Sequence, residues 1–108
     1  IHGLSKKRDS VVDICTNDEI NTNNSELPFQ LKEMIDDVFG DDSASIDKYF
    51  KASSMNVMAN YVHTQHNIVS IQLEINGDYR LFYDKSNSKQ SEELLNIIIQ
   101  WLKTILIV

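Results

Sequence analysis

The sequence has few of the residues that define several common kinds of protein site. Its one cysteine, Cys15, excludes an intrachain disulfide, and its three glycines form neither a Gly-x-Gly-x-x-Gly pattern nor a phosphate-binding loop. It also contains no Gly-x-Ser-x-Gly turn, no Cys-x-x-Cys pair and no His-x-x-Glu-His spacing. No single segment therefore encodes a nucleotide-binding loop, a serine-hydrolase elbow or a complete metal motif.

Basic residues and long apolar runs are also scarce. Ten Lys and Arg stand against 16 Asp and Glu, which gives a net charge of −6, whereas nonspecific binding to nucleic acid or an anionic membrane needs a basic face. No stretch reaches the ~18 apolar residues of a membrane helix, because Gln100 and Lys103 interrupt the apolar run 94–108. We therefore expect no nucleic-acid and no membrane partner. A local basic pocket for an anionic substrate remains open.

The 108 residues, 42% of them hydrophobic, are enough for one domain with its own core. Their apolar periodicity predicts an alternation of strands over 10–16, 44–48 and 67–75 with helices over 28–40, 55–64 and 91–106. After Asn76-Gly77-Asp78, residues 79–83 fit either a hairpin partner or an extended loop. The alternation predicts an α/β fold with a small mixed or mostly parallel sheet covered by helices.

The helix ends carry recognisable signals. Pro28 suits a first turn and Gly40 a helix end, while Ser53-Ser54 can cap the second helix. The segment Ser91-Glu92-Glu93-Leu94 has the form of a capping box for the last helix. We expect that helix to present one wide apolar face, made of Leu94, Leu95, Ile98, Ile99, Leu102, Ile105 and Leu106.

The most informative position is Glu74, a carboxylate inside the apolar, β-branched run 67–76. A carboxylate is costly to bury near the end of such a strand unless it is paired, bound to a metal or used in chemistry. Asp13 is a second candidate for a buried carboxylate, and Arg8, Arg80 or a backbone donor are its expected partners. These two acids are the first candidates for a functional site.

Other chemically useful residues have ordinary structural explanations. Cys15 lies in an apolar run, so a buried thiol is favoured over a nucleophile paired with a histidine. His63 and His66 fall near the end of the second helix, where surface or capping roles are typical. His2 is followed by Gly3 and can instead project into a cleft at the ends of strands.

A resemblance to a known family rests on the following segments, in chain order: His2-Gly3-Leu4, Arg8, Asp13-Ile14-Cys15-Thr16, Ile71-Gln72-Leu73-Glu74-Ile75-Asn76, Arg80 and Trp101-Leu102. Together they resemble the N-formylglutamate amidohydrolase-like family of zinc hydrolases. That family belongs with the carboxypeptidase-like metallohydrolases, which include succinylglutamate desuccinylase and aspartoacylase. The resemblance covers most of the chain but only the C-terminal half of the family's domain. It implies part of a three-layer carboxypeptidase-like fold.

The resemblance also implies roles for individual residues. His2 matches the third zinc ligand of the family, and Glu74 matches the general base that activates a zinc-bound water. Arg8 or Arg80 can hold a substrate carboxylate by a bidentate contact. The family's first two zinc ligands lie upstream of the position of His2, so residues 1–108 do not include them. We therefore expect the chain alone to bind no zinc and to be inactive.

The sequence thus predicts that residues 1–108 are one domain, the C-terminal portion of a longer zinc-dependent amidohydrolase. Its expected substrate is a small acidic amide or peptide, either an acylated amino acid or a glutamyl-type amide. Without the upstream strands, an exposed sheet edge is expected, through which copies of the chain can associate. The chain starts at Ile1 without Met or a signal sequence, and both a cytoplasmic and a secreted bacterial protein remain open.

Two other interpretations are kept. The chain can be a truncated or degenerate α/β domain that has a structural or binding role and no catalysis. It can also be an unrelated α/β domain in which Glu74 is the structural partner of a salt bridge. The position of Glu74 relative to His2, and the partners of its carboxylate, separate these interpretations.

Overall fold

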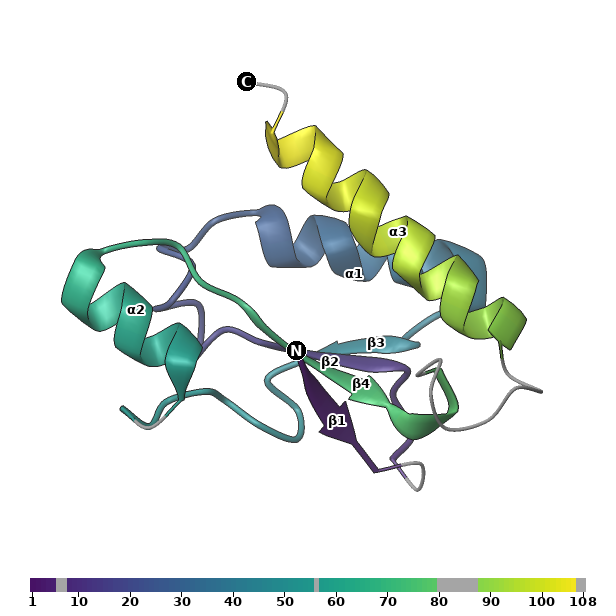
Figure 1. The fold of residues 1–108 in the computed structure, drawn as a ribbon, viewed down its shortest axis with the longest axis horizontal. Coiled ribbons are helices and arrows are strands. Elements are labelled where there is room, and N and C mark those ends of the chain that lie inside the picture. The colour runs from purple at the N-terminus through teal and green to yellow at the C-terminus, as the bar shows by residue number, and fades with distance from the viewer. Residues whose placement is uncertain (6–7, 56, 80–87, 107–108) are drawn as a thin grey trace.

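The computed structural model describes residues 1–5, 8–55, 57–79 and 88–106. Helices α1 and α3 lie together on one side of a sheet, and α2 lies beyond one end of it (Figure 1). The elements in chain order are β1 (His2–Leu4), β2 (Val12–Cys15), α1 (Leu27–Phe39), β3 (Ala44–Ile46), α2 (Met58–His66), β4 (Gln72–Asn76), the 3-10 turn η1 (Gly77–Tyr79) and α3 (Ser88–Leu106).

The sheet has four strands in the order β1-β4-β2-β3 and is mixed. Strand β1 runs parallel to β4, β3 runs parallel to β2, and β2 and β4 are antiparallel. The predicted α/β class with a small mixed sheet is therefore confirmed. Strand β1 was not predicted, because three residues are too few to show a strand periodicity.

The two faces of the sheet differ sharply in polarity. In the pairing of β2 with β4, Val12 faces Ile75 and Ile14 faces Leu73, whereas the alternate pairs are Asp13 with Glu74 and Cys15 with Gln72. Because successive residues of a strand point to opposite faces, one face is apolar and the other polar. The apolar face packs against α1 and α3, and its partners there include Leu31, Ile35, Leu94, Ile97, Ile98 and Trp101.

The first helix follows its sequence signals closely. Pro28 is buried in the first turn, and Gly40 follows the last residue with φ 108°, while its N–H donates to the Asp36 carbonyl over 2.8 Å. This φ lies where side chains with a Cβ are strained, which explains a glycine at the helix end. Leu31 and Ile35 are buried as expected, but Phe29 and Val38 are exposed.

The last helix differs from its prediction in two ways. It begins at Ser88, so Ser91 lies inside the helix, where its buried Oγ has no hydrogen-bond partner among the described residues. The capping-box prediction was therefore wrong. The packed face was also misplaced: Ile97 and Trp101 are buried beside Leu94 and Ile98, whereas three predicted members are exposed, namely Leu95, Ile99 and Leu102. The indole N–H of Trp101 donates to the Leu27 carbonyl over 2.9 Å. This hydrogen bond holds the Trp101 side of α3 against α1.

Helix α2 and strand β4 both start later than the sequence predicts. The residue at the N-cap of α2 is Val57, so Ser53-Ser54 does not serve as its cap. At the other end Asn67 adopts the left-handed conformation, with φ 52°, and its N–H donates to the His63 carbonyl over 2.8 Å. Asn tolerates this conformation, so α2 can end at Asn67. Strand β4 then begins at Gln72 and not at Asn67 as the sequence predicts.

The β3 edge of the sheet is capped by two side chains of α1. The Ala44 N–H donates to Asp36 Oδ1, and Lys32 Nζ donates to the Ala44 carbonyl, both over 2.9 Å. Lys32 and Asp36 also pair with each other over 2.6 Å. Backbone groups of an edge strand that are bonded in this way offer a poor template for another strand.

None of the described helices is long and apolar enough to cross a membrane.

Candidate functional site

Three of the residues that the sequence singled out lie in one row across neighbouring strands of the sheet. In the register of the sheet His2 pairs with Glu74, Glu74 pairs with Asp13, and Asp13 pairs with Ser45. Register partners share a face of a sheet, so these four positions belong to its polar face. The position of the predicted ligand His2 is therefore adjacent to that of the predicted base Glu74. Glu74 lies in the middle of β4 rather than near its C-terminal end.

Glu74 is buried, with 8% of its surface exposed. Gln72 lies two residues earlier on the same face, and its Nε2 donates to Glu74 Oε1 over 2.7 Å. This contact holds one carboxylate oxygen in a defined direction. None of the ion pairs within the described ranges includes Glu74, so the salt-bridge interpretation finds no support there. Arg80, a predicted substrate-binding residue, lies outside the described residues.

Asp13 is fully buried and accepts four hydrogen bonds from N–H and O–H donors, besides a longer one from the Cys15 thiol to Oδ2 over 3.8 Å. Its Oδ1 accepts from Ser45 Oγ over 2.7 Å and from the Lys48 N–H over 3.0 Å. Its Oδ2 accepts from the N–H groups of Tyr49 and Phe50 over 2.9 and 3.1 Å. The sequence allowed Arg8, Arg80 or a backbone donor as the partner of Asp13, and the structure shows backbone donors. Because they saturate both oxygens, Asp13 anchors the loop after β3 and is not available for a substrate.

Cys15 lies next to the two acids and is fully buried, as predicted. Burial, together with the negative charges of Asp13, Glu74 and Asp47, raises the pKa of the Cys15 thiol well above its ordinary value. The thiolate is the nucleophilic form of cysteine. Cys15 is therefore a neutral structural thiol and not a nucleophile.

Arg8 is exposed, with its guanidinium carbon 5.0 Å from the centroid of the Tyr49 ring. The Arg8 carbonyl accepts a hydrogen bond from Asn76 Nδ2 over 3.0 Å, which ties the backbone of Arg8 to the end of β4. The structure thus places Arg8 beside the loop that Asp13 anchors. His63 is half-buried in the last turn of α2, with its Nε2 2.8 Å from Asn23 Oδ1.

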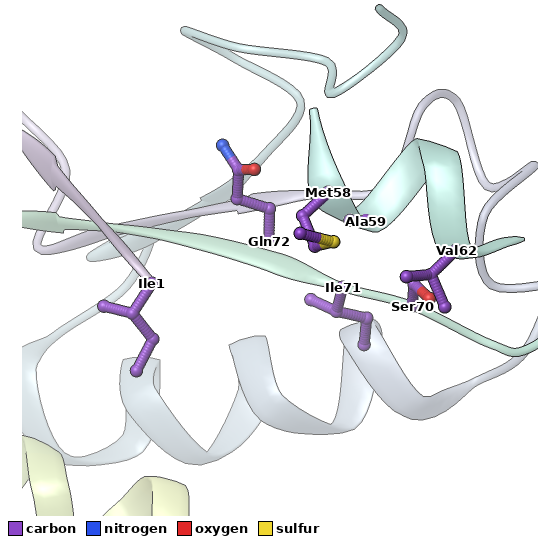
Figure 2. A pocket seen from close by; sticks show the side chains of 7 residues that line it. All are labelled: Ile1, Met58, Ala59, Val62, Ser70, Ile71 and Gln72. Atoms are coloured by element: carbon purple, nitrogen blue, oxygen red, sulfur yellow. The ribbon is translucent and has the colours of Figure 1, made fainter. Parts of the chain in front are cut away.

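A cavity of about 270 Å³ adjoins the first residue of β4. Its walls are mostly apolar and come from the start of the chain, from α2 and from the segment entering β4: Ile1, Met58, Ala59, Val62, Ser70, Ile71 and Gln72. Figure 2 shows Ile1 and Ile71 pointing to one side of the strand and Gln72 to the other. Sequence reasoning missed this cavity, since three distant segments form it.

The described residues contain no complete metal site. Across 1–5, 8–55, 57–79 and 88–106, no three His, Cys, Asp or Glu side chains gather closely enough to hold a metal ion. Imidazoles and carboxylates are ordinary zinc ligands, but one histidine and one glutamate do not make a complete ligand set. In comparisons of its sequence and structure, the chain matches no family model, no curated protein and no solved structure.

Proposed function

We propose that this chain is the C-terminal portion of a zinc-dependent amidohydrolase that cleaves an acylated amino acid or a glutamyl-type amide. The observation that carries the proposal is the register pairing of His2 with Glu74 on the parallel strands β1 and β4. Metal-assisted amide hydrolysis needs a ligand and a proton acceptor within reach of one water. The pairing supports the proposal because it brings these two residue types to neighbouring positions.

Each residue then has a defined task. When bound, zinc would lower the pKa of a coordinated water to about 7. His2 would be one ligand, and Glu74 would accept the proton of the water at a carboxylate oxygen. Gln72 orients the Glu74 carboxylate through Oε1, which keeps the base in a fixed position. Arg8 or Arg80 would hold a carboxylate of the substrate.

The remaining zinc ligands would be contributed by upstream residues of a longer protein. A second candidate function follows if those ligands do not exist: an α/β domain that is truncated or degenerate, with a structural or binding role. Both functions are compatible with the lack of a three-residue ligand group within the described ranges. Zinc content distinguishes the two, because only the amidohydrolase needs the metal.

The test uses the longer protein encoded by the parent gene. Its zinc content is measured by elemental analysis, and hydrolysis is followed with N-formylglutamate and other acylated amino acids. We expect about one zinc per protein, and Glu74→Gln should lower the turnover rate by at least about 100-fold while leaving zinc bound.

Glu92→Gln is the matched control, since it makes the same chemical change at an exposed position of α3. It should leave both zinc content and turnover unchanged. A parent protein without zinc would favour the degenerate domain. Unchanged turnover in Glu74→Gln would remove Glu74 from the mechanism.

A further inference from the structure

Another cavity, of about 320 Å³, lies between α1, α3 and the segment that enters β4. The described residues that line it are all apolar: Leu27, Val69, Ile71, Trp101, Leu102 and Ile105. Ile71 packs against the core cluster that contains Leu73 and the buried residues of α1 and α3. Because successive strand residues point to opposite faces, this cavity is on the apolar side of the sheet and Glu74 is on the other.

One hydrogen bond holds two walls of the cavity together. The indole N–H of Trp101 donates to the Leu27 carbonyl over 2.9 Å, and both residues line the cavity. In Figure 1 the C-terminal half of α3 lies above the start of α1, and these are the two helix segments that the bond joins. The one donor of the Trp101 side chain is thereby used, so the residue offers a ligand its ring surface.

The cavity opens to solvent beside two of its residues. Val69 and Leu102 are 41% and 43% exposed, whereas Trp101 is 5% exposed. Leu27, Ile71 and Ile105 are half-buried. Val69 and Leu102 thus form the rim of the cavity, and Trp101 forms its floor. A ligand that enters removes apolar surface of the rim from water, which favours binding.

The lining determines which ligands suit the cavity. A charged group placed among apolar side chains loses its hydration and gains no partner, so an uncharged ligand is favoured. A dry apolar cavity of about 150 Å³ holds one benzene ring, so 320 Å³ is room for about two rings. An aromatic ligand also gains an edge or offset contact with the Trp101 indole.

We propose that this cavity binds an uncharged aromatic group of the size of naphthalene, with Trp101 as its floor and Val69 and Leu102 as its rim. A second copy of the chain is a poorer occupant, because two chains that each carry a net charge of −6 repel each other. The site goes beyond the proposed hydrolase and does not depend on it, since it needs neither zinc nor Glu74.

The test uses the 108-residue chain, whose single tryptophan gives one indole N–H signal in an NMR spectrum. Naphthalene and 2-naphthalenesulfonate, which has the same rings and a negative charge, are titrated separately. We expect naphthalene to shift the Trp101 signal saturably and the sulfonate to bind at least about tenfold more weakly. Leu102→Gln should weaken naphthalene binding about fivefold, because it removes apolar surface from the rim.

Leu95→Gln is the matched control. Leu95 lies on the same helix and is 46% exposed, close to the value of Leu102, but it is not among the described residues that line the cavity. It should bind naphthalene as the unaltered chain does. A Trp101 signal that does not shift, equal weakening in the two variants, or equal affinity for the sulfonate would overturn the proposed site.

Sedimentation velocity tests the other occupant. We expect the same sedimentation coefficient for the unaltered chain and for Leu102→Gln. A dimer that Leu102→Gln dissociates, together with no binding of naphthalene, would make the cavity an interface between copies of the chain, and the ligand site would be wrong.

Discussion

Asp13 and Glu74 lie directly opposite each other in the antiparallel pairing of β2 with β4, but their carboxylates are held in different ways. Asp13 accepts from three backbone N–H groups, one hydroxyl and the Cys15 thiol. Glu74 accepts from the Gln72 amide, its one side-chain donor within the described part of the chain. A carboxylate has about four acceptor positions. Asp13 is therefore saturated, whereas the donors within the described residues leave acceptor positions of Glu74 open.

The first prediction concerns the stability contributed by Asp13. Asp13→Asn replaces one oxygen with an NH₂ group, which leaves buried N–H donors without an acceptor. We expect the free energy of unfolding to fall by about 3 kcal/mol, measured by urea denaturation. Asp41→Asn, at an exposed position in the turn after α1, should change it by less than about 0.5 kcal/mol. Equal effects of the two substitutions would contradict the anchoring role of Asp13.

Glu74→Gln should behave in the opposite way. The carbonyl oxygen of glutamine can still accept from Gln72, and the substitution removes a buried charge that has no ion-pair partner among the described residues. We expect the free energy of unfolding to stay within about 1 kcal/mol of the original value, measured in the same urea experiment. A loss as large as that of Asp13→Asn would show that Glu74 is a structural residue first.

The Cys15 thiol provides a prediction with a defined pH dependence. Burial and the charges of Asp13, Glu74 and Asp47 raise its pKa above the ordinary 9.0, so the unfolded chain loses this proton at lower pH than the folded chain. The resulting stability is fully present below about pH 9 and is lost as the pH rises further. In Cys15→Ala this part of the alkaline decline should be absent, as measured by urea unfolding between pH 8 and 11.

The same thiol should react slowly with a thiol reagent in the folded protein at pH 8, and quickly after unfolding in urea. Reaction at the same rate in both states would contradict the buried, neutral thiol.

The capped edge of β3 leads to the fourth prediction. Asp36→Ala removes the acceptor of the Ala44 N–H and the partner of Lys32, so the free energy of unfolding should fall by about 1–2 kcal/mol. Asp37→Ala, one residue further along α1 and exposed, should be nearly neutral. Sedimentation velocity should also show more self-association in the Asp36 variant, since an edge strand has lost its cover. A monomer of unchanged stability would contradict the role given to Asp36.

Local signals predicted the elements whose ends depend on neighbouring residues. Pro28 and Gly40 bound the first helix as expected, because both act on the φ angle of their own position. The strand around Asp13 and the burial of Glu74 also followed from short apolar runs. The packed face of α3, in contrast, depends on a contact with a distant segment, the hydrogen bond from Trp101 to Leu27, which no local signal reports.

The sequence by itself determined the fold class, the lack of an intrachain disulfide and the presence of two acids in buried strands. Only the tertiary structure decided what these acids do locally. The strand register made Asp13 and Glu74 opposite neighbours, and the loop after β3 supplied donors to one of them alone. The physical reason is that periodicity reports which residues leave water, whereas their partners depend on chain segments that meet only after folding.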